Sequence, residues 1–289
     1  MRTILKNLQY LLSRSLIFKV FEKGKIYLKS HRGYNPIVIY QMGKVGSMTI
    51  YETIRKYTEN PVFHVHFLSP NEIERVSKKY TKAGVVREPH HMRDSRLLSN
   101  YLKASRSINW YIITLVRDPI SAKMSHLFHN PKVHHQYLFD EEGNLDEERA
   151  LNVTYKSLMD FNPKSDFVCN WINNEFCTYL RVDLYQYPFN KEQGFQIIDV
   201  DKYKVLVLQT ESIDKALVNA LKEMKIINDD IQVIWFIEID NKEFSKMYNF
   251  VKSNIKVPDN KINEIYNSKY VRHFYNDVFI SKKIEQWVN

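Results

Sequence analysis

Cysteine is scarce in this chain, which has only Cys169 and Cys177, and no stretch of eighteen consecutive apolar residues occurs. The spacing of the two cysteines does not match a metal site, and so low a number predicts a reduced, cytosolic protein without disulfide bonds, its thiols buried by packing. The absence of a long apolar run excludes a membrane-spanning helix. Glycine is also scarce, with seven residues, so Gly43 and Gly46 stand out from the composition.

The chain also lacks internal repeats, low-complexity linkers and abrupt changes in composition, so no feature marks an internal domain boundary. Hydrophobic residues make up 44% of the 289 residues and charged residues 26%, which argues against both a disordered chain and a membrane bundle. We therefore expect one domain over residues 35–289, preceded by a separate segment over residues 1–34.

Positive charge is in excess, and the formal net charge is +9. This balance favours an anionic partner but does not choose among a nucleotide, an acidic glycan, nucleic acid and a lipid surface. In residues 1–34, apolar side chains such as Leu8 and Phe18 are interleaved with basic ones such as Arg14, and no cleavage site of a signal peptide is present. Two interpretations stay open: a basic amphipathic helix that touches the inner face of an anionic membrane through residues 1–30, or a helix packed on the domain.

The most informative stretch for function runs from Pro36 to Tyr57. Residues 37–40 form a short, β-branched apolar run that predicts a buried parallel strand, and apolar residues at helical spacing follow it. Between strand and helix lies a loop with two glycines and Lys44, and Ser47 is placed to cap the helix. This arrangement predicts a phosphate site, because the N–H groups at the helix start point at an anion and the lysine adds charge.

A second junction of the same kind follows residues 110–116, which predict the clearest strand in the chain. The strand runs directly into Arg117, Asp118 and Pro119. We expect Asp118 to cap a helix that Pro119 opens and that carries Ser125.

The other segments alternate between strand and helix patterns, which predicts the α/β class. A strand over residues 62–67 has His64 and His66 on one face, because side chains alternate along a strand. Residues 84–94 stay open between a strand and a loop. The remaining predictions are helices over 71–80, 151–161, 168–179 and 212–224, a hairpin over Leu184–Asp199 with its turn at residues 187–190, a strand over 204–209, and helices over 241–289 with breaks at Pro258 and near Asn276.

The order Lys44, any residue, Gly46 and a hydroxyl residue resembles the 5′-phosphosulfate loop of sulfotransferases, which bind 3′-phosphoadenosine 5′-phosphosulfate (PAPS). In that family an arginine at the end of a second strand and a serine eight residues later hold the 3′-phosphate, and these positions match Arg117 and Ser125. His66, followed by Phe-Leu-Ser-Pro, resembles the catalytic histidine of the cytosolic members.

The later part of the chain resembles a bacterial family of capsular polysaccharide synthesis proteins, which are themselves sulfotransferase-like. With the two phosphate motifs, the resemblance covers residues 35–289. The similar stretches are Trp171–Phe176, Asp183–Tyr185, Val257–Pro258, Ile262–Tyr270, His273–Tyr275 and Trp287.

The resemblance implies a three-layer α/β/α sandwich around a mainly parallel sheet, the P-loop-like sulfotransferase fold. It implies an enzyme that moves a sulfuryl group from PAPS to a carbohydrate hydroxyl in capsular or surface polysaccharide synthesis, with no metal and no nucleic acid. His66 would be the catalytic base, with His64 as the alternative, and Lys44 would neutralise the leaving group. The donor-binding residues would be Lys44, Val45, Gly46, Ser47, Met48, Thr49, Arg117 and Ser125.

Two positions depart from the sulfotransferase pattern. Met48 stands where many relatives have a second hydroxyl residue, so Thr49 or backbone N–H groups would do that work. Ala122 stands where some relatives have a second arginine, and Lys123 is the neighbouring substitute.

Two other classes of function stay open. A nucleotide-dependent kinase or triphosphatase would also use phosphate loops, but the chain lacks the Gly-Lys-Ser/Thr order and an evident magnesium-binding aspartate. A non-catalytic module that binds polyanions accounts for the charge and leaves the two junctions unexplained. The histidines between His126 and His135 do not have the spacing of a zinc site, so we expect no metal there.

Overall fold

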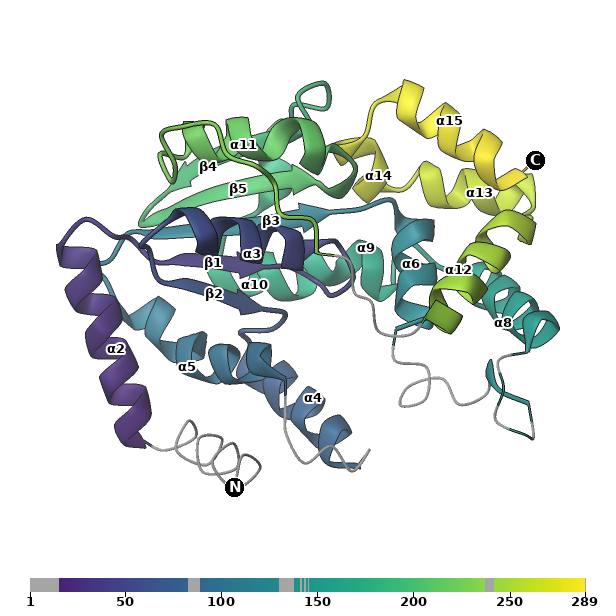
Figure 1. Cartoon of the computed structure of the whole chain (residues 1–289). Coiled ribbons are helices and arrows are strands. Elements are labelled where there is room, and N and C mark those ends of the chain that lie inside the picture. The colour runs from purple at the N-terminus through teal and green to yellow at the C-terminus, as the bar shows by residue number, and fades with distance from the viewer. Residues whose placement is uncertain are drawn as a thin grey trace.

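The computed structural model describes residues 16–82, 89–129, 138–140, 142, 144, 146–236 and 242–288. These residues form an α/β structure around one five-stranded sheet with the strand order β2-β1-β3-β5-β4 (Figure 1). The strands are β1 (Ile37–Tyr40), β2 (Val62–Val65), β3 (Trp110–Val116), β4 (Phe195–Val200) and β5 (Tyr203–Gln209). In the described part of the chain, all neighbouring pairs are parallel except β4 with β5, which confirms the predicted class and the mainly parallel sheet.

The central strands are apolar because helices cover both faces of the sheet. All four residues of β1 are buried, and six of the seven residues of β3 are. Ile37 lies opposite Val62 of β2 on one side and Tyr111 of β3 on the other. Because these strands are parallel and in register, their carboxyl ends meet at one edge of the sheet.

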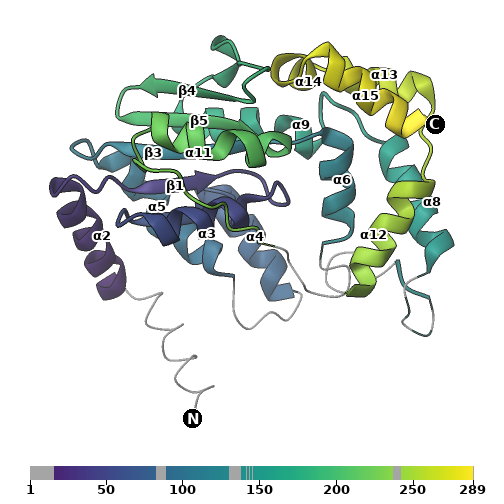
Figure 2. The ribbon, with the colours of Figure 1, turned by 45° about the horizontal axis from the view of Figure 1, so that its top comes forward.

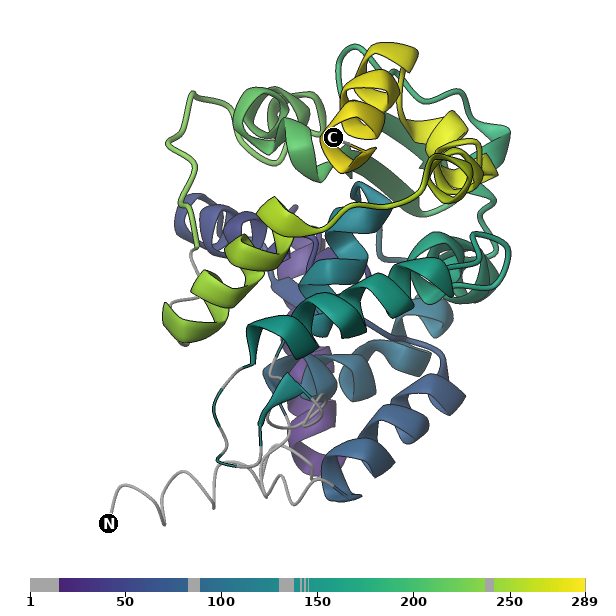
Figure 3. The same ribbon diagram turned by 90° about the vertical axis from the view of Figure 1, so that its right-hand side faces the viewer.

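The connections around β1 create a switch in direction. The chain passes from β1 through α3 (Ser47–Tyr57) to its neighbour β2, and then returns through α4 (Pro70–Lys82) and α5 (His90–Ala104) to β3 on the other side of β1. Helix α3 covers one face together with α11 (Ile213–Glu223), and α5 lies on the opposite face (Figures 1 and 3). Open α/β sheets bind ligands at such a switch point, between the carboxyl ends of the two strands.

Further helices gather beyond the carboxyl ends of the parallel strands, to the right of the sheet in Figure 1. Helix α12 packs on α8, α8 packs on α6, and α13 packs on α15, as Figure 2 also shows. This group therefore forms one wall beside the edge where the two predicted phosphate junctions lie. Its members are α6 (Pro119–Leu127), α8 (Glu147–Met159), α12 (Lys242–Asn254), α13 (Asp259–Tyr266), α14 (Lys269–Phe274) and α15 (Asp277–Val288).

A π-helix interrupts the helix that was predicted over residues 168–179. Helix α9 (Phe167–Trp171) runs into the π-helix η2 (Ile172–Cys177) and ends as α10 (Thr178–Leu180). Three aromatic rings of this segment pack on Tyr40 of β1, with ring centroids 5.2 Å away for Trp171, 5.3 Å for Phe176 and 6.1 Å for Tyr179. The segment thus covers the end of β1 next to the predicted loop.

The predicted hairpin within Leu184–Asp199 is wrong. Residues Leu184–Gln186 form a short 3₁₀ helix, η3, whose start is capped by the side chain of Asp183. The returning strand β4 pairs instead with β5, and Asp201 makes the tight turn between them in a left-handed conformation with φ 53°. The alternating pattern of residues 195–200 suits either partner, so the sequence pattern misassigned the pairing.

Helix α2 (Leu16–His31) lies against α5, with Ile26 buried between them. Residues 1–15 of the predicted N-terminal segment lie outside the described residues. Among the helices that the structure describes, none combines the length and the apolar character needed to cross a bilayer.

Candidate anion-binding and active site

The loop between β1 and α3 leaves the start of α3 without a side-chain cap. Gly46 is the N-cap residue, in a left-handed conformation with φ 78°, and within the described ranges no side chain caps the first turn. The prediction that Ser47 caps this helix is therefore wrong. Uncapped N–H groups at the positive end of a helix are a suitable seat for an anion. Lys44, also left-handed with φ 64°, precedes them by two residues.

Gly46 lies against the segment that follows β5. A Cβ atom at this position would lie 3.4 Å from Ile213 and 3.5 Å from Thr210, which follow β5. The Thr210 hydroxyl also donates a hydrogen bond to the Val45 carbonyl oxygen at 2.9 Å. The loop is thus held against a third strand end.

The Ser47 hydroxyl points into the protein. With the Gln41 amide oriented to satisfy its neighbours, its nitrogen donates to the carbonyl oxygens of Ile39 and Val65, and its oxygen accepts from Ser47 Oγ at 2.7 Å and His64 Nε2 at 3.0 Å. Ser47 Oγ lies 2.9 Å from His64 Nε2. This buried network fixes the loop to β2.

The two predicted phosphate junctions touch each other. Nη1 of Arg117, the first residue after β3, donates to the backbone carbonyl oxygen of Lys44 at 2.5 Å. The Tyr248 side chain on α12 hydrogen-bonds to the Arg117 side chain as well. Arg117 and Lys44 therefore lie side by side at the switch point of the sheet.

Buried polar contacts from the C-terminal helices hold the second junction. The Asp118 carboxylate caps α6 by accepting from Ser121 N at 2.9 Å, as predicted, and accepts from Tyr266 Oη at 2.6 Å. Tyr270 Oη accepts from Arg117 N and donates to Arg117 O, both at 3.0 Å. Glu211 Oε1 accepts from Asp118 N at 2.8 Å, and burial raises the pKa of Glu211. These contacts fix the backbone from which the Arg117 side chain extends.

His66 lies directly after β2, and its surroundings select one tautomer. Its Nδ1 lies 3.0 Å from the Gln41 carbonyl oxygen, an acceptor, so Nδ1 carries the proton. Its Nε2 then has a lone pair and lies 3.8 Å from the position that a Gly43 Cβ would take. The free base nitrogen therefore faces the loop.

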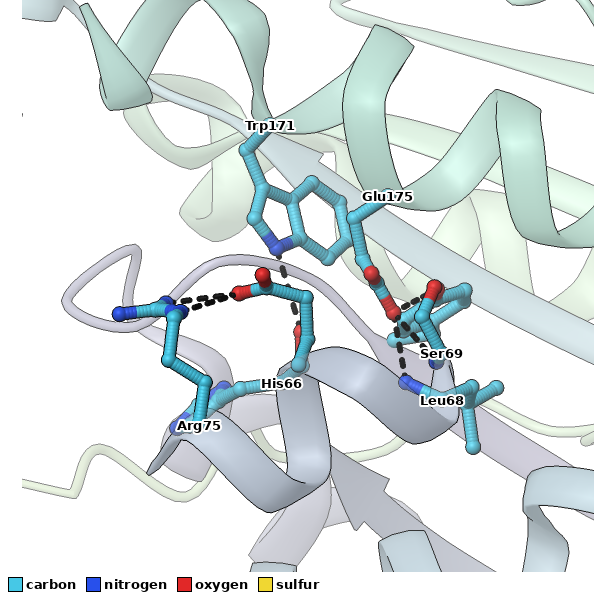
Figure 4. A network of polar contacts seen from close by, with 8 residues as sticks. His66, Leu68, Ser69, Arg75, Trp171 and Glu175 are labelled. Carbon is cyan, nitrogen blue, oxygen red and sulfur yellow. Dashed lines mark hydrogen bonds and ion pairs between the residues drawn. The ribbon is translucent and has the colours of Figure 1, made fainter. Parts of the chain in front are cut away.

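The π-helix segment supports the backbone around His66 (Figure 4). Trp171 Nε1 donates to the His66 carbonyl oxygen at 3.1 Å. Glu175 Oε1 accepts from Leu68 N at 2.6 Å, Ser69 N at 2.9 Å and Tyr40 Oη at 2.7 Å. A buried carboxylate with three donors is a rigid anchor, so the loop that presents His66 is well fixed.

Other imidazoles gather around Gly43. His126 Cε1 on α6 lies 3.6 Å from the same Cβ position, on the approach shared with His66. The His91 ring centroid lies 4.5 Å from that of His66, and the His64 centroid lies 4.9 Å from it. His126 Nε2 and His64 Nδ1 are buried and have no hydrogen-bond partner among the residues that the structure describes. We call His64, His66, His91 and His126 the histidine cluster.

The histidine cluster is neutral at pH 7. Burial is the main cause that lowers the pKa of His66 to about 4, of His126 to about 3 and of His91 to about 2, and it lowers that of His64 too. Neighbouring positive charge adds to the effect, since Lys44 lowers the pKa of His66 and of His126. An anion bound between these groups would oppose both causes and raise the pKa of each imidazole.

The other predicted donor residues lie on the same two helices. Thr49 is buried and its hydroxyl accepts from Phe236 N at 3.2 Å, while Met48 beside it is half-buried. Ser125 lies on α6, two turns after Arg117. Lys123, named as the substitute for a second arginine, is bound to Asp166 at 2.6 Å.

Both cysteines are free, and burial raises the pKa of each thiol, that of Cys177 to about 11. Within the described ranges, no three His, Cys, Asp or Glu side chains are arranged to hold a metal ion. Part of the histidine-rich stretch between His126 and His135 lies outside those ranges.

Fold and site together define an α/β protein with a candidate anion site at the switch point of its sheet. Residues 144–276, slightly less than half of the chain, match the family model NKWYS, described as "Putative capsular polysaccharide synthesis protein". This match supports the capsular polysaccharide synthesis family. It includes Glu175, Glu211 and Tyr248 but not Lys44, His66 or Arg117. The comparisons with curated proteins and with solved structures found no match.

Sequence reasoning did not select three residues that the structure brings to the site. His126 appeared only within a histidine-rich stretch that was considered for zinc. Tyr248 has no neighbouring motif, and its contact with Arg117 depends on how α12 packs. Glu175 could have been suspected, because a carboxylate within an apolar helical stretch needs buried partners.

Proposed function

We propose that this protein transfers a sulfuryl group from PAPS to a carbohydrate hydroxyl in the synthesis of a capsular or surface polysaccharide. The observation that carries the proposal is the 2.5 Å hydrogen bond from Arg117 Nη1 to the Lys44 carbonyl oxygen. It joins two cationic strand-to-helix junctions at one switch point, as a ligand with two separated phosphate groups requires. The capsular polysaccharide match supports a carbohydrate acceptor.

In this proposal the loop and the second junction bind opposite ends of the donor. The uncapped N–H groups after Gly46 would hold the 5′-phosphate, and Lys44 would neutralise the charge that develops on the leaving oxygen. Arg117 and Ser125 would hold the 3′-phosphate, with the guanidinium group providing a planar fork of donors. A P-loop-like sulfotransferase fold is the arrangement that this assignment implies.

His66 would be the catalytic base. As the acceptor oxygen forms its bond to sulfur, the bond from sulfur to the phosphate oxygen breaks, and the acceptor proton moves to His66 Nε2. The Gln41 carbonyl oxygen keeps the other ring nitrogen protonated and would stabilise the imidazolium that results. His64 is less suited to this role, because its Nε2 is already engaged with Gln41 and Ser47.

His126 gains a role in the same proposal. Its Nε2 is buried and has no hydrogen-bond partner in the described part of the chain, while its Cε1 faces Gly43. A buried polar atom that lacks a hydrogen-bond partner lowers the stability of the folded protein by about 1–3 kcal/mol. An oxygen atom of PAPS bound over Gly43 would accept a hydrogen bond from His126 and remove that cost. We expect His126 to donate a hydrogen bond to the transferred group.

Thermal stabilisation tests donor binding directly. Adenosine 3′,5′-bisphosphate, the product, should raise the melting temperature by about 5 °C at 100 times its Kd, since binding to the native state alone contributes about 2.7 kcal/mol. Lys44→Ala and Arg117→Ala should reduce this shift. Lys225→Ala is a matched control, because Lys225 is exposed and has a left-handed backbone like that of Lys44, with φ 61°.

Turnover with labelled PAPS and a panel of glycans then tests the base. His66→Ala should lower kcat far more than it changes the binding of the bisphosphate, whereas His31→Ala on α2 should change neither. Stabilisation by ATP with magnesium, and none by the bisphosphate, would refute sulfuryl transfer and favour a kinase or triphosphatase. Equal binding and turnover by Lys44→Ala, Arg117→Ala and wild type would refute the site assignment.

A further inference from the structure

Helix α2 exposes four large apolar side chains on one side, which we call the apolar face. The exposed fractions are 63% for Val20, 60% for Phe21, 47% for Tyr27 and 58% for Leu28. At about 100° per residue, these four side chains lie within an arc of about 120° on one side of the helix. Large apolar side chains gathered on one face usually mark an interaction surface, whereas single exposed ones do not.

The opposite side of α2 is attached to the domain, which fixes the direction of the apolar face. Ile26 is 1% exposed, Tyr101 Oη of α5 donates to the Lys23 carbonyl oxygen at 3.1 Å, and Lys29 Nζ donates to the Glu59 carbonyl oxygen at 2.7 Å. Turning the exposed side chains inward would break these contacts. The apolar face is therefore presented outward in the folded protein.

Positive charge borders the apolar face. Residues 16–31 contain four lysines and one glutamate, and Arg32 follows directly. By helical position, Lys23 lies at one edge of the face and Lys25 at the other. Lys25 Nζ lies 4.3 Å from the centroid of the Phe21 ring and 3.0 Å from Glu22 Oε1, so a charged pair adjoins the apolar surface at this edge.

From this juxtaposition we infer that α2 is an interfacial anchor that docks on an anionic lipid bilayer. Phe21, Leu28 and their neighbours enter the boundary between headgroups and acyl chains, and the lysines remain among the anionic headgroups. A bilayer fits both halves of this surface, because it offers apolar depth beneath a layer of negative charge. The inference is independent of the reaction proposed above.

Co-sedimentation with vesicles tests the anchor. The full chain should sediment with vesicles of phosphatidylcholine and phosphatidylglycerol in equal amounts, and much less with phosphatidylcholine alone. The double variant Phe21→Ser/Leu28→Ser should lower the apparent partition coefficient by about 100-fold, because each buried apolar side chain contributes about tenfold. Val278→Ser is the matched control, since Val278 is 78% exposed on α15, and it should partition like wild type.

Tryptophan fluorescence measures whether the side chain at position 21 enters the bilayer. Phe21→Trp should give a blue-shifted emission component with anionic vesicles, and Val278→Trp should not. Melting temperatures of all variants should stay close to that of wild type, because the altered side chains are exposed. Equal partitioning of the double variant and wild type would overturn the inference. A second result would also overturn it: no binding to vesicles, together with a wild-type dimer in sedimentation velocity that the double variant disrupts. The apolar face would then join two copies of the chain.

Discussion

Acidification from pH 7.5 to 5.5 should destabilise this protein steeply, because the folded protein holds the histidine cluster in the neutral form. The pKa of His66 is lowered to about 4, that of His126 to about 3 and that of His91 to about 2, from an ordinary value of 6.5. The folded protein therefore binds almost no proton at these groups above pH 5. The unfolded chain binds one proton at each as the pH falls through 6.5, so the unfolded state is favoured by acid.

The size of the effect follows from these values. Between pH 7.5 and 5.5, each of the three histidines should remove about 1.4 kcal/mol from the free energy of unfolding, or about 4 kcal/mol together. A typical domain is stable by only about 5–15 kcal/mol, so the loss is large enough to measure easily. The loss begins below about pH 7 and continues toward the folded-state pKa values.

Urea denaturation at both pH values, for wild type and for His126→Gln, isolates the contribution of one group. The variant should lose about 1.4 kcal/mol less than wild type over this interval, because all other titrating groups are common to both proteins. Leu127→Ala is the matched control. It removes buried apolar volume from the neighbouring position and should lower the stability equally at the two pH values.

The result that would refute the reasoning is equal pH dependence of wild type and His126→Gln. It would mean that His126 titrates alike in the folded and unfolded states, and that its imidazole is not buried in neutral form beside Gly43. The role proposed for its unpartnered nitrogen in donor binding would then lose its basis.

Three further substitutions test single contacts, each read from the free energy of unfolding in urea. Gly46→Ala should cost about 1–2 kcal/mol from its left-handed backbone alone, because the added Cβ would meet Ile213 at an ordinary van der Waals distance of 3.4 Å; Gly33→Ala, with φ 90° and open space, is the matched control, and a much larger loss at Gly46 would contradict this expectation. Glu175→Gln should cost about 2 kcal/mol and lower kcat if turnover is present, whereas an unchanged stability would mean that the charge of this carboxylate is not needed. Tyr266→Phe should lower the free energy of unfolding by about 1–3 kcal/mol, because Asp118 Oδ1 loses the hydrogen bond from Tyr266 Oη; an unchanged value would mean that another group donates to this oxygen.

Much of the sheet could be predicted, because a strand that is buried on both faces is a short run of mostly apolar residues in the sequence. Residues 37–40 are all apolar and residues 110–116 are apolar except for Thr114, and they form β1 and β3 with the predicted limits. The pairing of β4 could not be predicted in this way, because it depends on which strand lies beside it in space. Helix α5 was missed because residues 84–94 show no clear periodicity, although the helix begins at His90.

In the candidate site, too, local sequence patterns could be predicted and contacts between distant segments could not. The sequence predicted Lys44 and Arg117 at two separate strand-to-helix junctions, and the structure brings Arg117 Nη1 into contact with the Lys44 carbonyl oxygen. The inward turn of Ser47 was not foreseen, because it depends on two buried polar residues, Gln41 directly after β1 and His64 on β2. Contacts from α6 and α12 arise from packing of distant segments, for which residue type and spacing give no rule.

The π-helix η2 makes the spacing between Trp171 and Glu175 a structural requirement. Each backbone hydrogen bond there spans one residue more than in an α-helix, and the two side chains that support the His66 loop lie at its start and within it. Loss of one residue from Ile172–Cys177 would restore ordinary helical geometry and rotate everything beyond it by about 100°. Glu175 or Trp171 would then face away from the loop, so homologous chains that keep the same active arrangement should keep this segment at constant length.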